Sequence, residues 1–105
     1  MNETEIAGHL YNVAVRRAQH HKVKFGPGAD ADLRGMTVYA AVQIKGAAIP
    51  QQDAIRTGEL LIERLVDEMQ HQAVILEGAG GQHVIGEETL RRARSLLCPS
   101  WPLCP

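Results

Sequence analysis

Aromatic side chains are scarce in this chain, which has one Phe, two Tyr and one Trp among its 105 residues. A core must therefore be built from aliphatic side chains and Met, which favours close helix packing over a β-sandwich. The two cysteines, Cys98 and Cys104, both lie near the C-terminus, so a disulfide framework does not hold the fold together. The apolar runs are too short to span a bilayer, and the acidic N-terminus lacks the pattern of a signal peptide. We therefore expect a soluble, intracellular protein that does not bind membranes.

Length and composition predict a single globular domain. Of the residues, 45% are apolar and 22% are charged, and a chain of this length is about the size of one domain. The net charge is −1, so the chain is not a polycation. Its basic residues nevertheless gather in two clusters, one at Arg16, Arg17, Lys22 and Lys24 and the other at Arg91, Arg92 and Arg94.

The first helix is expected from Asn2 to about Lys22. Its apolar residues recur at helical spacing, and Asn2 with Glu5 has the pattern of a capping box. The helix should stop at Gly26-Pro27-Gly28, since this tripeptide combines two flexible residues with one that lacks a backbone donor. The sequence therefore predicts a linker over residues 25–30.

The strongest helix is predicted from about Gln52 to about Gly78, with a continuous apolar stripe. At about 1.5 Å per residue it would be on the order of 40 Å long, whereas a compact domain of this size has a radius of gyration of ~13 Å. One short chain does not readily cover such a stripe, and a large exposed apolar stripe marks an interface. We infer an obligate dimer whose interface is formed by Leu61, Ile62, Leu65, Met69, Ala73 and Leu76.

The remaining segments flank this helix. Residues 33–45 fit both a strand and a helix, because their apolar residues match both periods. Residues 83–85 favour a short β segment, and a final helix is predicted from about Glu87 to Leu97. That helix begins with acidic residues and continues with arginines, as its dipole favours.

Two loops flanking the long helix carry a resemblance to a known family. The segment Gly46–Ala54 is similar to the first loop and central-helix start of archaeal-type histones, and Ala79–Ile85 is similar to their second loop. The chain therefore resembles the histone-fold family over residues 31–97. This implies an all-α fold of short, long and short helices, with residues 33–45 helical and with an additional N-terminal helix. Residues 1–30 would precede the histone-fold domain, and residues 98–105 would form a Cys/Pro tail.

The resemblance also implies a dimer, but several residues of this chain differ from those of the family in the loops that would form the dimer and bind DNA. Histone-fold chains form handshake dimers, in which the first loop of each subunit pairs with the second loop of the other. Pro50 departs from this pattern because it removes a backbone donor from the first loop. Ala48 or Ile49 stands where the family offers an arginine, Gln82–Val84 replaces Arg-Lys-Thr, and Thr89 replaces an Asp. The usual DNA-binding loop residues are thus largely missing.

The leading functional hypothesis is a dimeric, nucleoid-associated protein of the cytoplasm that binds double-stranded DNA without sequence specificity. Phosphate contacts would come from Arg16, Arg17, Lys22, Lys24, Arg91, Arg92 and Arg94. Each cluster also fits an ordinary solvated helix face. The alternative function is a heterodimerising histone-fold adaptor subunit that does not bind DNA. The sequence leaves open whether the partner in the dimer is a second copy of the chain or another histone-fold chain.

Catalytic interpretations find little support. Gly78–Gly81 lacks the ending of a P-loop and the full GxGxxG spacing, and fits a glycine-capped helix end better. His20 and His21 point about 100° apart on a helix and make a poor metal-chelating pair. We therefore expect no enzyme, no cofactor and no metal. Cys98 and Cys104 fit a frayed terminus, although a reversible disulfide or a docked Trp101 stays open.

Overall fold

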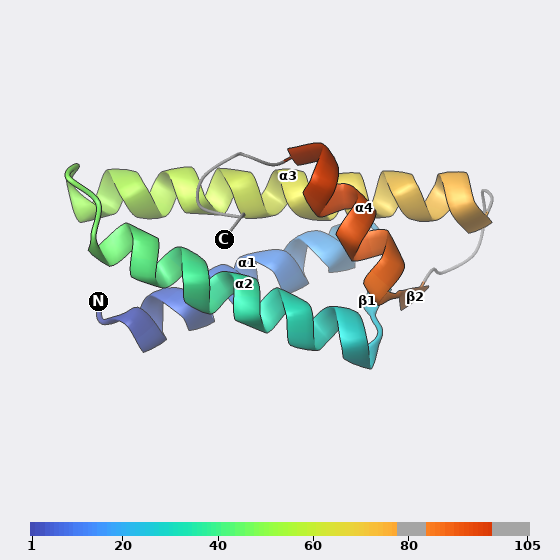
Figure 1. Cartoon of the computed structure of the whole chain (residues 1–105), viewed down its shortest axis with the longest axis horizontal. Coiled ribbons are helices and arrows are strands. Elements are labelled where there is room, and N and C mark those ends of the chain that lie inside the picture. The colour runs from blue at the N-terminus through green and yellow to red at the C-terminus, as the bar shows by residue number, and fades with distance from the viewer. Residues whose placement is uncertain (78–83, 98–105) are drawn as a thin grey trace.

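The computed structural model describes residues 1–77 and 84–97, apart from the side chains of residues 76 and 77. It consists mainly of helices (Figure 1). The elements in order are α1 (Glu3–His20), β1 (Lys24–Phe25), α2 (Pro27–Lys45), α3 (Gln51–Glu77), β2 (Val84–Ile85) and α4 (Glu87–Leu97). All four expected helices are confirmed, and the ambiguous segment 33–45 is helical. The predictions for Gly78–Gly81 and for the tail with Cys98 and Cys104 lie outside the described residues.

Helix α1 begins where the sequence predicts. The Asn2 side chain accepts a hydrogen bond from the Glu5 backbone N–H at 2.8 Å, and the Glu5 carboxylate accepts one from the Asn2 N–H at 3.0 Å. This reciprocal pair satisfies two backbone donors that the first turn would leave open. The capping box is therefore confirmed.

The predicted linker at residues 25–30 is wrong, because this segment is strand β1 followed by the first turn of α2. Pro27 occupies a first-turn position of α2, where its missing N–H costs nothing. The Gly26 N–H donates to the Ile85 carbonyl at 2.8 Å, and a Cβ on Gly26 would lie 3.2 Å from that carbonyl oxygen. A Cβ on Gly28 would overlap the side chain of Glu87, which is exposed and can move away. Gly26 thus allows the start of α2 to approach β2 closely.

Strands β1 and β2 pair in parallel within one chain, with Lys24 opposite Val84 and Phe25 opposite Ile85. The resemblance implied a different pairing, between the loop around Pro50 and a second subunit. Residues 46–50 instead connect α2 to α3 and form no strand. Two successive parts of the chain therefore repeat one order of elements: a helix, a two-residue strand, a glycine and a second helix.

The core lies where α1, α2 and α4 cover the long helix α3 (Figure 1). Ile62, Leu65, Met69 and Ala73 are all 0% exposed within the single chain. Leu61 is half-buried, and the side chain of Leu76 lies outside the described part. The inference that the stripe needs a second chain to hide it is therefore wrong. It failed because α1 serves as part of the cover instead of preceding the domain.

Gly58 shows how closely the three helices meet. This buried glycine lies within α3, and a Cβ built on it would be 3.1 Å from Ile44 Cδ1 of α2 and 3.5 Å from Leu10 Cδ2 of α1. Glycine lowers helix propensity, but here its missing side chain makes room for both neighbouring helices. The molecule is 42 Å in its longest dimension, close to the ~40 Å expected for a 27-residue helix such as α3. Within residues 1–77 and 84–97, no helix is both long and apolar enough to cross a membrane.

Replacing Leu65 with Asp should unfold the chain instead of separating a folded dimer. The charge would be buried without a partner at a side chain that is 0% exposed, at a cost of about 4 kcal/mol or more. The matched control is Leu60→Asp on the same helix, where the side chain is 47% exposed and little stability should be lost. Circular dichroism with sedimentation distinguishes the two outcomes. A helical Leu65→Asp monomer would contradict this account.

Candidate functional site

Three cations are exposed around the C-terminal end of α1. Arg16 lies in its last turns, Lys22 in the turn that follows and Lys24 in β1, and all three side chains are exposed. None of them makes an ion pair with a residue in the described part of the chain. His20 is also exposed, one turn after Arg16. We call Arg16, His20, Lys22 and Lys24 the basic end of α1.

The turn after α1 fixes the position of Lys22. The Val23 N–H donates to the Ala18 carbonyl at 3.0 Å and the Lys22 N–H donates to the Gln19 carbonyl at 3.1 Å, which is a Schellman motif. Lys22 occupies the left-handed position of this motif with φ 58°, where glycine is usual. A non-glycine residue in this conformation costs on the order of 1 kcal/mol. The buried Val23 and Ala18 complete the motif.

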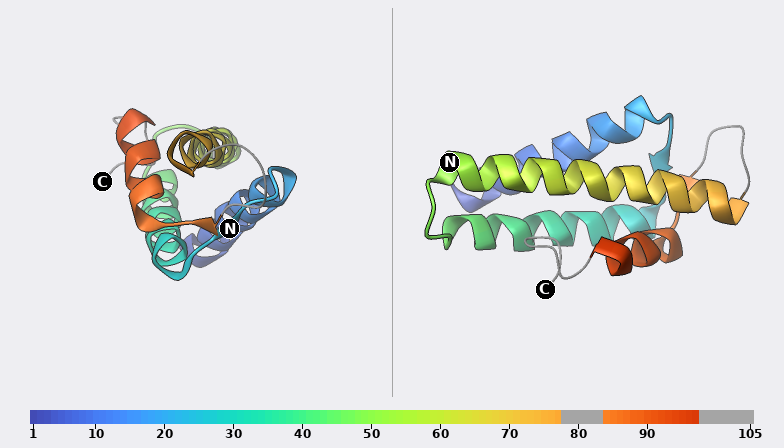
Figure 2. Two further views of the ribbon diagram at one scale, coloured as in Figure 1. Left: turned by 90° about the vertical axis from the view of Figure 1, so that its right-hand side faces the viewer. Right: turned by 90° about the horizontal axis from the view of Figure 1, so that it is seen from above.

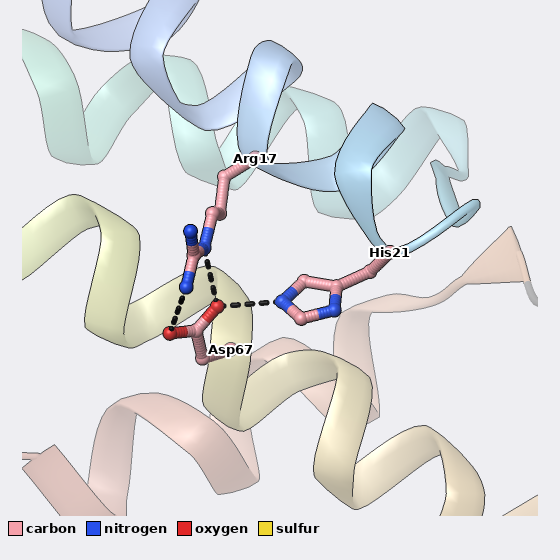
Figure 3. Close-up of polar contacts among 3 residues, drawn as sticks. All are labelled: Arg17, His21 and Asp67. Atoms are coloured by element: carbon pink, nitrogen blue, oxygen red, sulfur yellow. Dashed lines mark hydrogen bonds and ion pairs between the residues drawn. The ribbon is translucent and has the colours of Figure 1, made fainter.

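Arg17, which the sequence predicts as a phosphate contact, is engaged by a carboxylate of its own chain (Figure 3). Its guanidinium donates to both carboxylate oxygens of Asp67 on α3, at 2.7 and 3.0 Å. His21 Nε2 lies 2.6 Å from the same carboxylate. Hydrogen bonding from Arg17, and to a smaller extent from His21, holds the pKa of Asp67 below its ordinary value of 3.8. Arg17 therefore joins α1 to α3, and most of its charge is compensated.

The second basic cluster lies on α4. Arg91 pairs with Glu87 at 3.3 Å and with Glu88 at 3.6 Å on its own helix, whereas Arg92 is exposed and Arg94 is half-buried. Seen along the long axis, α1 and α4 lie on opposite sides of the molecule (Figure 2). One chain therefore does not combine the two predicted clusters into one surface.

A cavity of about 690 Å³ that the sequence did not predict lies beside the basic end of α1. It lies in the bend between α1, β1 and the first turn of α2. Its lining is Tyr11, Val15, Ala18, Gln19, Lys22, Val23, Lys24, Phe25 and Asp30. The turn geometry brings these residues together, and the apolar residues flanking the two lysines are the one sign of the cavity in the sequence.

The carboxylate in this cavity is already engaged. Asp30 accepts a hydrogen bond from the Tyr11 hydroxyl and another from Arg34 Nε at 2.9 Å. The Tyr11 hydrogen bond and then that of Arg34 lower the pKa of Asp30, so it stays ionised but paired. The Arg34 guanidinium carbon also lies 4.1 Å from the centre of the Tyr11 ring. This group of three side chains fixes one wall of the cavity.

A second cavity, of about 290 Å³, lies between α1 and α3. It is mainly polar, because Arg16, Arg17 and Arg56 face Glu59 and Glu63 there. His9 Nε2 lies 2.8 Å from Glu59 at the same junction. Acidic and basic groups nearly balance, so this groove does not favour a ligand of one charge.

Comparison of the chain with family models, with curated proteins and with solved structures gives no match.

Replacing Asp67 with Asn should lower the thermal midpoint at pH 7 by about 2–4 °C, because the pair is partly exposed and such pairs contribute little. The lowered pKa means that Asp67 stabilises the fold above its ordinary pKa, and that this contribution disappears as the pH falls through the folded-state value. The difference between wild type and Asp67→Asn should therefore shrink below about pH 4. Thermal melts across this pH range test it, with the neighbouring Glu68→Gln as the control. A constant difference at all pH values would argue against the pairing.

Proposed function

We propose that the protein binds the phosphate backbone of double-stranded DNA without sequence specificity, through the basic end of α1. The observation that carries this proposal is the exposure of Arg16, Lys22 and Lys24 without ion pairs among the described residues. Near Lys22 and Lys24 the carboxylates of Asp30 and Asp67 are occupied by Arg34, Tyr11, Arg17 and His21. Glu59 and Glu63 share the groove beside Arg16, so the positive charge is strongest at the two lysines. The basic end therefore keeps a local positive charge although the whole chain carries −1. Unpaired cations of this kind release counterions when they meet phosphates.

The arrangement favours bridging over wrapping. Helix α4 lies on the side of the molecule opposite α1 and carries the exposed Arg92, which has no ion pair among the described residues. This cation offers one phosphate contact to a second duplex segment, whereas wrapping needs contacts along one continuous face. The sequence resemblance of residues 31–97 to histones suggested DNA as the partner, but the loops of this chain lack the arginines through which histones contact DNA. The proposal therefore rests on the basic end of α1 and not on this resemblance.

The test is duplex binding measured over a series of salt concentrations. The affinity should fall steeply as salt rises, and Arg16→Ala, Lys22→Ala and Lys24→Ala should each reduce the slope of log K against log salt by about 0.9. Lys45→Ala is the matched control, because Lys45 is exposed at the far end of α2 and bonds the Met1 carbonyl. Absence of binding at low salt, or an equal change of slope in the control, would reject the proposal.

A second candidate function is pairing with another protein chain through α2. Val38 is 57% exposed and Val42 is 47% exposed, one turn apart, and they continue a line of exposed small residues from Ala31 and Gly35. Such an apolar helix face fits a partner helix, and the simplest partner is a second copy of this chain. This surface differs from the α3 stripe to which the sequence analysis assigned the dimer.

Introducing Val38→Glu and Val42→Glu together should convert a dimer into a folded monomer. Both side chains are exposed, so the charges should disrupt association without damaging the core. Sedimentation equilibrium of the wild type and the double variant tests this, with Leu60→Glu on α3 as the control. A wild type that remains monomeric at high concentration would exclude self-association through this face.

A further inference from the structure

The cavity between α1, β1 and α2 has the size of a site for a small molecule. Its volume of about 690 Å³ lies within the usual range of such sites, which are apolar with a few polar groups that orient the ligand. Val15 and Phe25 are half-buried along its walls, and Val23 is buried beneath it. The apolar lining and two lysines therefore occur in one cavity.

The charges of the cavity favour an anion. Lys22 and Lys24 line it and are exposed, and neither pairs with a described residue. The opposing charge of Asp30 is compensated by Arg34 and by the hydrogen bond from Tyr11. A ligand thus meets two available ammonium groups and a carboxylate that already has partners.

The helix cap places Lys22 beside the cavity. Lys22 has φ 58° at the left-handed position of the Schellman motif, and the motif accounts for this φ. Glycine would be less strained there, but it would leave no ammonium group in the lining of the cavity.

We propose that this cavity binds a small molecule with an apolar body and one carboxylate, of the type of a medium-chain fatty acid. The carboxylate lies between the ammonium groups of Lys22 and Lys24, and the apolar body lies along Val15, Val23 and Phe25. This site is separate from the proposed DNA contact of Arg16, which lines the groove on the other side of α1.

Titration of the ¹⁵N-labelled full chain with decanoate tests the proposal by NMR. The amide signals of residues 15–25 should shift in a saturable manner. Acetate, which has only the head group, and decyltrimethylammonium, which has the opposite charge, should bind at least tenfold more weakly. Shifts confined to the Val38 and Val42 face, equal binding of the cationic probe, or no saturation at millimolar decanoate would overturn the proposal.

Substitutions at the cavity make the test specific. Lys24→Met keeps the apolar stem and should weaken decanoate binding about two- to fivefold, the size of effect expected for one exposed charge. Val15→Phe should fill the cavity and weaken binding at least tenfold, with its amide spectrum reporting whether the fold is intact. The control Lys45→Met should leave the affinity unchanged.

Lys22→Gly separates binding from stability. Glycine adopts the positive φ at this position without strain, so the change should raise the thermal midpoint. Removal of the ammonium group should weaken decanoate binding about two- to fivefold. Unchanged decanoate affinity in a stabilised Lys22→Gly variant would overturn the role of this lysine.

Arg16→Ala separates this proposal from DNA binding. The variant should reduce the salt dependence of DNA binding and leave decanoate affinity unchanged, so either proposal can fail alone. An Arg16→Ala effect on decanoate as large as that of Lys24→Met would count against the cavity as the site.

Discussion

The packing of α1, α2 and α4 over the apolar stripe of α3 is the interaction on which the rest of the structure depends. A 27-residue helix with Ile62, Leu65, Met69 and Ala73 on one side loses all exposure of these side chains inside a single chain. Gly58 permits this by letting Leu10 and Ile44 approach the axis of α3. Because these four side chains are covered within one chain, association between chains would use other apolar side chains, and Val38 and Val42 of α2 are exposed, as are Leu60 and Ile75 of α3.

The sequence predicted the local elements well and the long-range contacts poorly. The capping box at Asn2, the long helix and the final helix each follow from signals within a few residues of one another. The interpretation of Gly26-Pro27-Gly28 as a linker failed because the partner that explains it, Ile85, lies far away in the chain. A tripeptide that looks like a helix breaker proved to be a site of close approach between the start of α2 and β2.

In the candidate site too, the sequence predicted local features but not contacts between distant parts of the chain. Exposure of Arg16, Lys22 and Lys24 agrees with their positions on a polar helix end, whereas the pairing of Arg17 with Asp67 depends on how α1 crosses α3. The cavity depends on the bend after α1, which no periodicity reveals. Lys22 and Lys24 serve both proposals, so an apolar carboxylate and a DNA phosphate would compete for the same two ammonium groups. A carboxylate ligand would then oppose DNA binding at this end of α1.

The parallel pairing of Lys24–Phe25 with Val84–Ile85 has a consequence for biosynthesis. While a ribosome is still making α3, the emerged chain has α1, β1 and α2 but lacks both the helix they cover and the strand that pairs with β1. Helices α1 and α2 can pack against each other at this stage, but their apolar surfaces that face α3 in the finished fold lack their cover. The complete core therefore forms only after β2 and α4 have emerged, and until then the uncovered surfaces are targets for chaperones.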